Sequence, residues 1–492
     1  MIGNLVTWPA KLFLMLAALF WAAAPADAQW RRAESSNFVV FAKAPESELR
    51  DRVRLLEDYD QLLRALMGTQ TPSSPNKLRV YLVRGWSEMS TVLPGVSRSA
   101  AGVYFTNPNG ILAIADMRAE LGNEMAVLLH EYAHHFMMQY HGRVYPPWYV
   151  EGFAEFMMTA RFTDRAVEFG HTDKVRVQAL SDRYNWLPLE QILFERPRDR
   201  AALSRYYAQS WLLTHYLLND AERLRQFRAY IAALSRAEDP RRAFSASFGG
   251  EPEEMQARLK RYAFGGLTFL RVPRSSAQSP KAVAIEELPP SSDDLLLLQA
   301  SLVVEPSKNP EGLARIRRAA AKHSDAFAQR VLAQAEALYG DAAVADRLID
   351  KLLASNPQDA ELMHYKGMRY LRAALASPPG QRGDLQRQAR SWFSRAHAID
   401  GKSFQTLYRY VQTFDGEPGA ASENNAEMLV LANALAPQVP EVRLVAARLL
   451  MGLGDFELAE TLLLPMVGTA HEGPLTNDAR ALLEKARSRV PH

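Results

Sequence analysis

The chain has 492 residues, which is too long for one compact core, so we expect two or three domains. Hydrophobic residues make up 48% and charged residues 23%, a globular balance that excludes a largely disordered chain. The 58 basic and 55 acidic residues leave a formal net charge of +3, which gives no reason to expect nucleic acid as a partner. Cysteine is absent, so any metal site must be built from His, Asp or Glu.

The N-terminal 28 residues have the pattern of a secretory signal peptide. Lys11 precedes an apolar run over residues 12–24, and Ala26-Asp27-Ala28 supplies small residues at the expected cleavage site. The alternative is a retained membrane anchor, but the run is shorter than the roughly 20 residues that a spanning helix needs. We therefore predict cleavage after Ala28 and export, to a periplasmic or secreted location that fits a bacterial protein. No later stretch is apolar enough to predict a stable membrane span after cleavage.

Short strands and one helix are predicted next. Residues 37–41 read as a strand, and residues 46–67 carry apolar side chains at three- and four-residue steps, which indicates a helix. Residues 78–83 alternate as a second strand. Residues 102–105 and 111–115 are further strands, and the turn-forming residues between them predict a hairpin. The strand over 111–115 has two equally weighted interpretations: an exposed edge that pairs with an extended peptide, or plain core.

A His-Glu-x-x-His pattern lies on the next predicted helix, which runs from about residue 123 and ends near Gly142. His130 and His134 are four residues apart, so both imidazoles lie on one helical face and can bind one tetrahedral metal ion. Glu131 lies about 100° round the helix from His130. That position is near the metal without pointing at it, as a base acting on metal-bound water requires. The pattern is fairly specific, although ordinary surface helices also produce it.

A second helix, predicted immediately downstream, adds carboxylates at matching spacing. Glu151 follows His134 after enough chain to turn back, so it can supply the oxygen ligand of a His2Glu zinc site, with the fourth position left for water. Glu155, one turn further along, can accept the free N–H of His130 and fix its tautomer. Gly152 is expected to let the two helices approach closely.

With the His-Glu-x-x-His pattern and the later Glu-Gly-x-Ala-Glu pattern, the chain resembles the gluzincin metallopeptidases of the peptidase MA clan. The resemblance implies an α+β zincin-like catalytic domain over residues 29–270, with a small mixed sheet plus the active-site helices. It implies that His130, His134 and Glu151 bind one Zn²⁺ ion and that Glu131 is the general base. The implied reaction is hydrolysis of peptide bonds in a polypeptide substrate by metal-activated water.

A downstream tyrosine is a further catalytic candidate by the same resemblance, because many gluzincins supply a Tyr or His that hydrogen-bonds the tetrahedral intermediate. Tyr207 is favoured for this role and Tyr206 is the second choice; both are expected at the start of a helix that runs to Leu218. A phenol aimed at the oxyanion would stabilise the transition state. The alternative is that both tyrosines are half-buried packing residues, and it explains the pattern equally well.

Four further histidines receive no catalytic role. His135 and His141 lie near the pattern but off its ligand face, so we expect surface groups or supports behind the ligands. His171 and His215 are isolated in the sequence, and we expect them to be structural.

The C-terminal part of the chain is predicted to be all-α. Residues 271–294 are polar and rich in Pro and Ser, which predicts a linker. Residues 295–492 follow, rich in Ala and Leu. Within them, residues 326–357 and 441–464 each pair two helices through a Gly-Asp turn, which resembles tetratricopeptide repeats. We therefore predict a tetratricopeptide-like repeat domain that binds a protein partner or presents substrate, with a plain helical bundle as the alternative.

Two other functions compete with peptidase activity. The C-terminal helices could serve as a non-catalytic scaffold or adaptor beside a vestigial metal site. The same zinc chemistry could also act on a non-peptide amide or ester. The complete set of catalytic residues favours an enzyme over the scaffold.

Overall fold

The computed structural model describes residues 29–489 except 118–124, 143, 183, 198, 237, 275–281, 305–308, 418 and 468–472. The predicted signal peptide, residues 1–28, therefore lies outside the described residues. Within the described part, no helix combines the length and the apolar character needed to cross a lipid bilayer.

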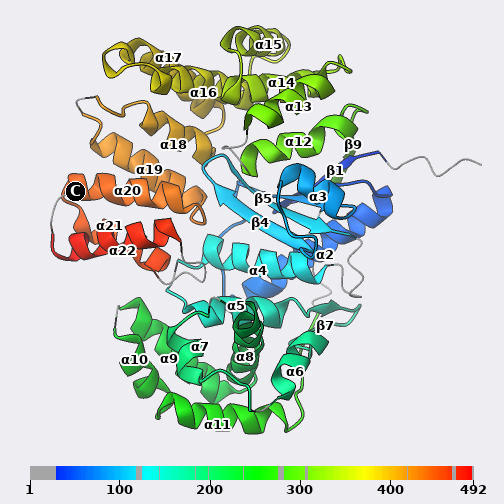
Figure 1. Cartoon of the computed structure of the whole chain (residues 1–492), viewed down its shortest axis with the longest axis vertical. Coiled ribbons are helices and arrows are strands. Elements are labelled where there is room, and N and C mark those ends of the chain that lie inside the picture. The colour runs from blue at the N-terminus through cyan, green and yellow to red at the C-terminus, as the bar shows by residue number, and fades with distance from the viewer. Residues whose placement is uncertain are drawn as a thin grey trace, which may run out of the picture.

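A mixed sheet, with six strands among the described residues, lies near the centre of the molecule in the order β4-β5-β3-β2-β1-β9 (Figure 1). Its strands are β1 (Arg31–Glu34), β2 (Phe38–Ala42), β3 (Leu78–Val83), β4 (Gly102–Asn107), β5 (Gly110–Asp116) and β9 (Ala284–Glu287). β2, β3 and β5 are parallel neighbours, whereas β4 pairs antiparallel with β5. The predicted hairpin is thus confirmed as β4–β5. The core interpretation of residues 111–115 is also confirmed, because β4 covers β5 and is itself the edge strand.

Helices cover both faces of this sheet. α2 (Glu46–Met67) and α4 (Ala126–Tyr140) share a core with one face, and α3 (Trp86–Val92) and α12 (Ser292–Val304) share a core with the other. α2 forms over the predicted range because its buried residues recur at helical spacing, and Gly68 ends it in the left-handed conformation at φ 66°. The alternating side chains of the strands therefore feed two separate cores.

A helical layer follows α4 in the chain. It contains α5 (Pro147–Met157), α6 (Lys174–Ser181), α7 (Leu189–Phe194), α8 (Arg200–Leu218), α9 (Ala221–Ser235), α10 (Pro240–Phe248) and α11 (Pro252–Ala263). A small sheet accompanies it, formed by β6 (Arg161–Phe162), β7 (Ala166–Phe169) and β8 (Leu270–Pro273). The helix predicted from Tyr206 begins earlier, at Arg200. Asp199 caps this start by accepting a hydrogen bond from the Ala202 amide at 2.8 Å.

The segment predicted as a linker contributes to both sheets. Most of β8 lies within residues 271–294 and pairs with β7, and β9 pairs antiparallel with β1. Arg31 and Arg32 of β1 each place a guanidinium nitrogen 3.1 Å from a carboxylate oxygen, of Glu287 and Glu286 respectively. These cross-strand ion pairs help to hold a short, exposed strand at the edge of the sheet.

The C-terminal part of the chain is a series of helices joined by short connections, which confirms a helical-repeat region. After α12 come α13 (Asn309–Ala320), α14 (Ala326–Tyr339), α15 (Ala342–Ser355), α16 (Ala360–Ala376), α17 (Gly383–Ile399), α18 (Phe404–Gln412), α19 (Glu423–Leu435), α20 (Pro440–Gly452), α21 (Phe456–Val467) and α22 (Pro474–Arg487). The two predicted helix pairs are confirmed as α14–α15 and α20–α21. Asp341 caps α15 by accepting from the Val344 amide at 2.9 Å, and Gly454 turns the second pair at φ 86°.

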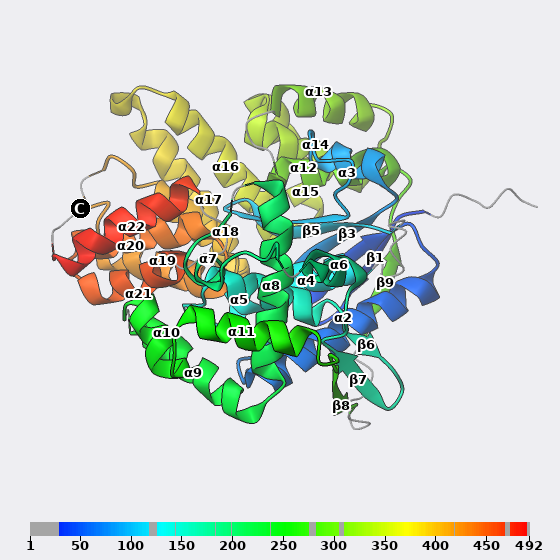
Figure 2. The ribbon, with the colours of Figure 1, turned by 60° about the horizontal axis from the view of Figure 1, so that its bottom comes forward.

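This helical stack curves around the β4–β5 hairpin, and its last helices lie beside α4 (Figure 1, Figure 2). Asn107 of the hairpin donates to the Val303 carbonyl at 2.6 Å, and Arg409 of α18 donates to Asn109 Oδ1 at 2.8 Å. Buried residues of α18 to α22 belong to the same continuous hydrophobic core as α2, α4 and α5. The stack is therefore packed against the N-terminal part of the chain.

Candidate metal centre

α4 carries the two histidines of the His-Glu-x-x-His pattern, and another of its side chains anchors the helix to α2. Tyr132, which lies between His130 and His134 in the sequence, donates a hydrogen bond to Asp60 Oδ1 of α2 at 2.8 Å. Asp60 Oδ2 in turn accepts from Arg64 Nε at 2.7 Å. Most buried phenols in proteins have such a partner. The bond therefore sets how α4 is rotated about its own axis, and with it the direction of both imidazoles.

His135 and His141 hold the surroundings of α4 in place. His135 is buried, and its Nδ1 shares a 2.9 Å hydrogen bond with the Tyr104 hydroxyl on the edge strand β4. Burial lowers the pKa of His135 to about 3, so the ring is neutral. His141 Nε2 lies 2.8 Å from Thr69 Oγ1. Both residues lie outside the ligand group, and His135 is a buried support rather than a surface group.

α5 carries Glu151 and is packed tightly against α8. A Cβ added at Gly152 would lie less than 3.0 Å from the Ser210 carbonyl oxygen and from Thr214 Oγ1. The close approach expected between α4 and α5 at this glycine therefore occurs between α5 and α8. Because Gly152 follows Glu151 directly, this packing fixes the backbone from which the Glu151 carboxylate projects.

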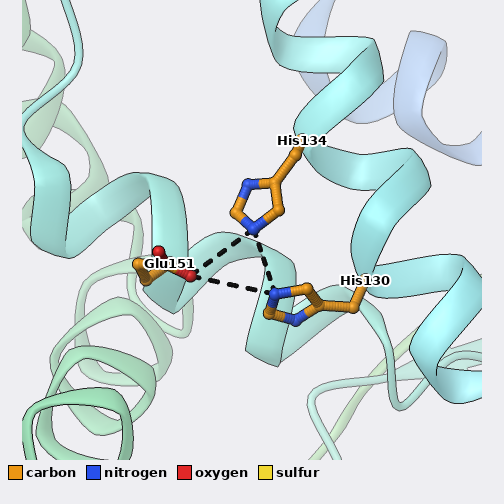
Figure 3. Close-up of side chains that lie close together, drawn as sticks. All are labelled: His130, His134 and Glu151. Atoms are coloured by element: carbon orange, nitrogen blue, oxygen red, sulfur yellow. Dashed lines mark hydrogen bonds and ion pairs between the residues drawn. The ribbon is translucent and has the colours of Figure 1, made fainter. Parts of the chain in front are cut away.

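The three predicted ligands meet at one point (Figure 3). His130 Nε2 and His134 Nε2 are 3.0 Å apart, and Glu151 Oε2 lies 3.8 Å from the first and 3.4 Å from the second. In the described part of the chain they are the one group of three such side chains that could hold a metal ion. Zinc–ligand distances of about 2.0–2.1 Å place neighbouring atoms of a tetrahedron about 3.3 Å apart. The donor set and its spacing therefore fit one zinc ion.

Burial and neighbouring charges together shift the pKa values of the ionisable groups at this centre. Glu151 is 2% exposed and His134 is 6% exposed. Burial disfavours a charged His134, but the carboxylates of Glu151, Glu131 and Glu155 together, with Glu151 first among them, outweigh this effect and raise the pKa of His134. Burial also raises the pKa of Glu131; His134 opposes this shift and Glu151 adds to it. A glutamate whose pKa is raised is better matched to proton transfer near neutral pH.

Glu155 lies behind His130, one turn along α5 from Glu151. Its Oε1 is 3.8 Å from His130 Nδ1, the ring nitrogen that does not face the other two ligands. Both oxygens of Glu155 accept hydrogen bonds from Arg176 of α6, at 2.6 and 2.5 Å. Glu155 is therefore placed where a support for His130 belongs, but its closest partner is a guanidinium that no spacing pattern in the sequence indicates.

Tyr206 and Tyr207 occupy different environments on α8. Tyr206 is fully buried, and its hydroxyl has no hydrogen-bond partner among the residues that the structure describes. Tyr207 is partly buried, and its hydroxyl accepts from Arg196 Nη2 at 3.3 Å. Arg196 also lies 3.6 Å from Glu151 Oε1. Burial raises the pKa of both phenols and Glu151 adds to each shift, so both remain protonated near neutral pH.

His171 and His215 do not belong to the ligand group, in keeping with structural roles. The His171 ring stacks on Phe269, with ring centroids 4.3 Å apart. His215 is fully buried, and its Nδ1 lies 2.8 Å from the Tyr262 hydroxyl.

A cavity of about 400 Å³ opens beside the ligands. Glu131 and His134 line it from α4, and Tyr104 lines it from β4. The C-terminal helices supply other parts of its wall, including Gln438 before α20 and Arg443 within α20. The site is thus a cleft shared by both halves of the chain. No local sequence pattern predicts this wall, because it depends on contacts between segments that are far apart in the chain.

Comparisons with known proteins add little to this geometry. No protein-family model matches the chain, and no curated protein matches it. Among solved structures, one similar chain is a thermophilic TPR protein of Thermus thermophilus, with 18% identity and a TM-score of 0.33 over 40% of this chain and 99% of that chain. Another, described as MamA MSR-1 C2, has 16% identity and a TM-score of 0.25 over 40% of this chain and 95% of that chain. TM-scores this low carry no argument about the site.

Proposed function

We propose that the chain is an exported, zinc-dependent hydrolase of peptide bonds, with His130, His134 and Glu151 as the zinc ligands. The observation that carries the proposal is the convergence of two imidazole nitrogens and one carboxylate oxygen within 4.8 Å of one another. Three protein ligands of this kind are the donor set of a catalytic zinc site, whereas structural zinc sites use four. Zinc bound there would act as a Lewis acid, which would lower the pKa of a bound water and polarise the scissile carbonyl.

Glu131 is the general base in this proposal. It follows His130 on α4 and lines the cavity beside His134. A carboxylate in this position can accept a proton from the attacking water and then deliver it to the leaving amine. The raised pKa of Glu131 makes its carboxylate a stronger base toward that water.

Tyr207 is the proposed hydrogen-bond donor to the oxyanion. It is the less buried of the two neighbouring tyrosines, so its hydroxyl is better able to reach a substrate than that of Tyr206. Its hydrogen bond from Arg196 positions the phenol near Glu151. A protonated phenol at that point would stabilise the negative charge that develops on the carbonyl oxygen.

The Glu131→Gln substitution tests the reaction. The zinc-loaded full chain is incubated with a random peptide library, and cleavage is read by mass spectrometry. Removal of the base should slow hydrolysis roughly 100- to 10,000-fold while zinc stays bound. Glu48→Gln, on the exposed side of α2, is the matched control and should leave hydrolysis unchanged. Unchanged hydrolysis in the Glu131 variant would show that the assigned mechanism is wrong.

A zinc hydrolase of non-peptide amides or esters is a closely related candidate. It uses the same ligands and the same base, so the metal site does not separate the two activities. Panels of simple amides and esters, run beside the peptide library, do separate them. Cleavage of the panels with none of the peptides would replace the peptidase proposal.

A non-catalytic scaffold is the candidate from another class, and the long helical-repeat region favours it. Helical stacks often bind partners on their concave side. Here the β4–β5 hairpin lies against that side, through bonds such as Arg409 to Asn109. A protein partner would therefore need another surface of the stack. Absence of any hydrolysis by the zinc-loaded chain would favour this candidate.

A further inference from the structure

The cavity beside the candidate zinc site has a polar wall from a part of the chain other than α4 and α5, the helices that carry the zinc ligands and the general base. Gln438 precedes α20, and Arg443 lies in the first turn of α20. They border the same cavity as Glu131 and His134 of α4. A molecule that fills this cavity therefore lies beside His134 and Glu131 and also against side chains from the C-terminal part of the chain.

The Gln438 side chain is buried without partners. It is 4% exposed, and neither its Nε2 nor its Oε1 has a hydrogen-bond partner among the described residues. A buried amide without partners destabilises the folded chain, because it has lost water at both its donor and its acceptor. A peptide unit offers an acceptor and a donor side by side. The unpaired amide donor and acceptor of Gln438 therefore complement the carbonyl and N–H groups of a peptide backbone.

The Arg443 side chain is a buried cation with neutral partners. It is 7% exposed, and it donates to Asn433 Oδ1 at 3.2 Å and to the Pro437 carbonyl at 2.7 Å. These bonds use two of the five N–H donors of a guanidinium. Burial lowers the pKa of Arg443 to about 10, and no carboxylate in the described part of the chain offsets this effect. It is the one Lys or Arg among the described residues that line the cavity.

We propose that Gln438 and Arg443 form a subsite that binds a carboxylate of a peptide substrate together with the peptide unit next to it. The proposal rests on the proposed hydrolase function, because it places the bond to be cleaved at the zinc centre across the same cavity. A guanidinium binds a carboxylate through two parallel hydrogen bonds. The carboxylate comes from the C-terminus of the substrate or from an Asp or Glu side chain, and both sources use the same chemistry.

Peptide binding without turnover tests this subsite. The full chain carrying Glu131→Gln is loaded with zinc and immobilised. It is offered random octapeptides with free C-termini, the same peptides with amidated C-termini, and amidated peptides that lack Asp and Glu. Retained peptides are counted by mass spectrometry. We expect at least tenfold weaker retention of the last set than of the first. Equal retention of these two sets would overturn the proposal.

The amidated set that contains Asp and Glu identifies the source of the carboxylate. Loss of retention in this set supports a C-terminal carboxylate, and persistent retention of Asp- or Glu-containing peptides supports a side chain. Adding Arg443→Gln should lower retention of carboxylate peptides at least tenfold. Arg448→Gln, on the exposed side of α20, is the matched control and should leave retention unchanged. Equal retention by the Arg443 and Arg448 variants would overturn the proposal.

Gln438→Met separates binding from folding. Methionine has the same length without a polar amide, so the variant removes two buried polar atoms that lack partners. We expect weaker peptide retention together with an unchanged or raised melting temperature. A lowered melting temperature with unchanged retention would show a structural role and overturn the assignment of Gln438. These binding results do not depend on turnover. A chain that binds carboxylate peptides but cleaves none would retain the subsite and lose the hydrolase proposal.

Discussion

Two glutamates four residues apart on α5 have different partners. Glu151 lies within reach of both imidazole Nε2 atoms, whereas Glu155 is paired with Arg176 and lies behind His130. The arrangement follows from helical spacing, since residues four apart project from the same side of a helix at successive levels. One carboxylate can therefore bind a metal while the other orients a ligand of that metal.

The substitution Glu155→Gln tests this division of roles. It removes the charge behind His130 and leaves Arg176 without its carboxylate partner. Loss of such a support typically weakens metal binding roughly 10- to 100-fold, and we expect a weakening of this size. Zinc affinity is measured by competition with a chromogenic chelator. Glu190→Gln, at an exposed ion pair with Arg241, should bind zinc like the native chain. Native affinity in the Glu155 variant would exclude a supporting role.

The buried His215 side chain predicts a loss of stability in acid. Burial lowers the pKa of His215 from 6.5 to about 4, so the folded chain holds the neutral ring. Below pH 6.5 the unfolded chain binds a proton that the folded chain does not. The free energy of unfolding should therefore fall by at most about 1.4 kcal/mol per pH unit between pH 6.5 and 4 from this residue.

Urea unfolding at several pH values measures this dependence, with His215→Gln as the comparison. The variant should have a shallower fall between pH 6.5 and 4 than the native chain. Parallel curves for the two chains would mean that His215 does not contribute to acid sensitivity.

At the level of single residues, the spacing of His130, His134 and Glu151 was sufficient to predict that they meet. Helical geometry places the two histidines on one face of α4, and the short connection to α5 brings Glu151 beside them. Arg176 and Arg196 could not be predicted in the same way. They reach the site from segments whose position depends on tertiary packing, and arginines on surfaces have similar sequence surroundings.

At the level of elements, the contact between α5 and α8 positions Glu151. Gly152→Ala would place a methyl group against the Ser210 carbonyl and Thr214, and backbone atoms cannot move aside easily. We expect this overpacking to lower the free energy of unfolding by roughly 1–3 kcal/mol. The variant should also bind zinc more weakly than the native chain, because α5 must shift.

Denaturant unfolding and zinc titration measure the two effects. Gly452→Ala is the control, because nothing lies within 4 Å of an added Cβ there. This change should be neutral or slightly stabilising at the end of α20. Equal stability of the two variants would mean that α5 and α8 are not closely packed in solution.

Elements with strong periodicity could be predicted from the sequence to within a few residues, and others could not. α2 and β3 occupy their predicted ranges because their apolar patterns alone select helix and strand. The start of α8 is set by the cap residue Asp199, which has no apolar pattern around it. β9 becomes a strand through pairing with β1, so a polar segment that suggests a linker joins the central sheet.

At the level of the whole molecule, the helical stack and the sheet share their cores. Leu296 of α12 is buried in a cluster with Tyr81, Leu112 and Ile114 of the sheet. Such sharing depends on contacts between distant segments, and local patterns therefore predict each half without predicting how the halves meet. The same reason explains why the wall formed by the C-terminal helices is absent from the sequence-based prediction of the site.

Leu296→Ala tests the shared core. It should lower the free energy of unfolding by roughly 2–5 kcal/mol. Hydrogen exchange should become faster in β3 and β5 as well as in α12, because the sheet loses part of its own core. Leu453→Ala, at a leucine that is 39% exposed, is the control and should change neither quantity appreciably. Faster exchange confined to the helical stack would show that the two halves fold independently.

The zinc centre itself is tested most directly by anomalous diffraction from crystals of the full chain grown with zinc, recorded on both sides of the zinc absorption edge. We predict one strong anomalous peak about 2.0–2.2 Å from His130 Nε2, His134 Nε2 and an oxygen of Glu151. A map with no peak among these three side chains, or with Glu151 turned away from both histidines, would contradict the account.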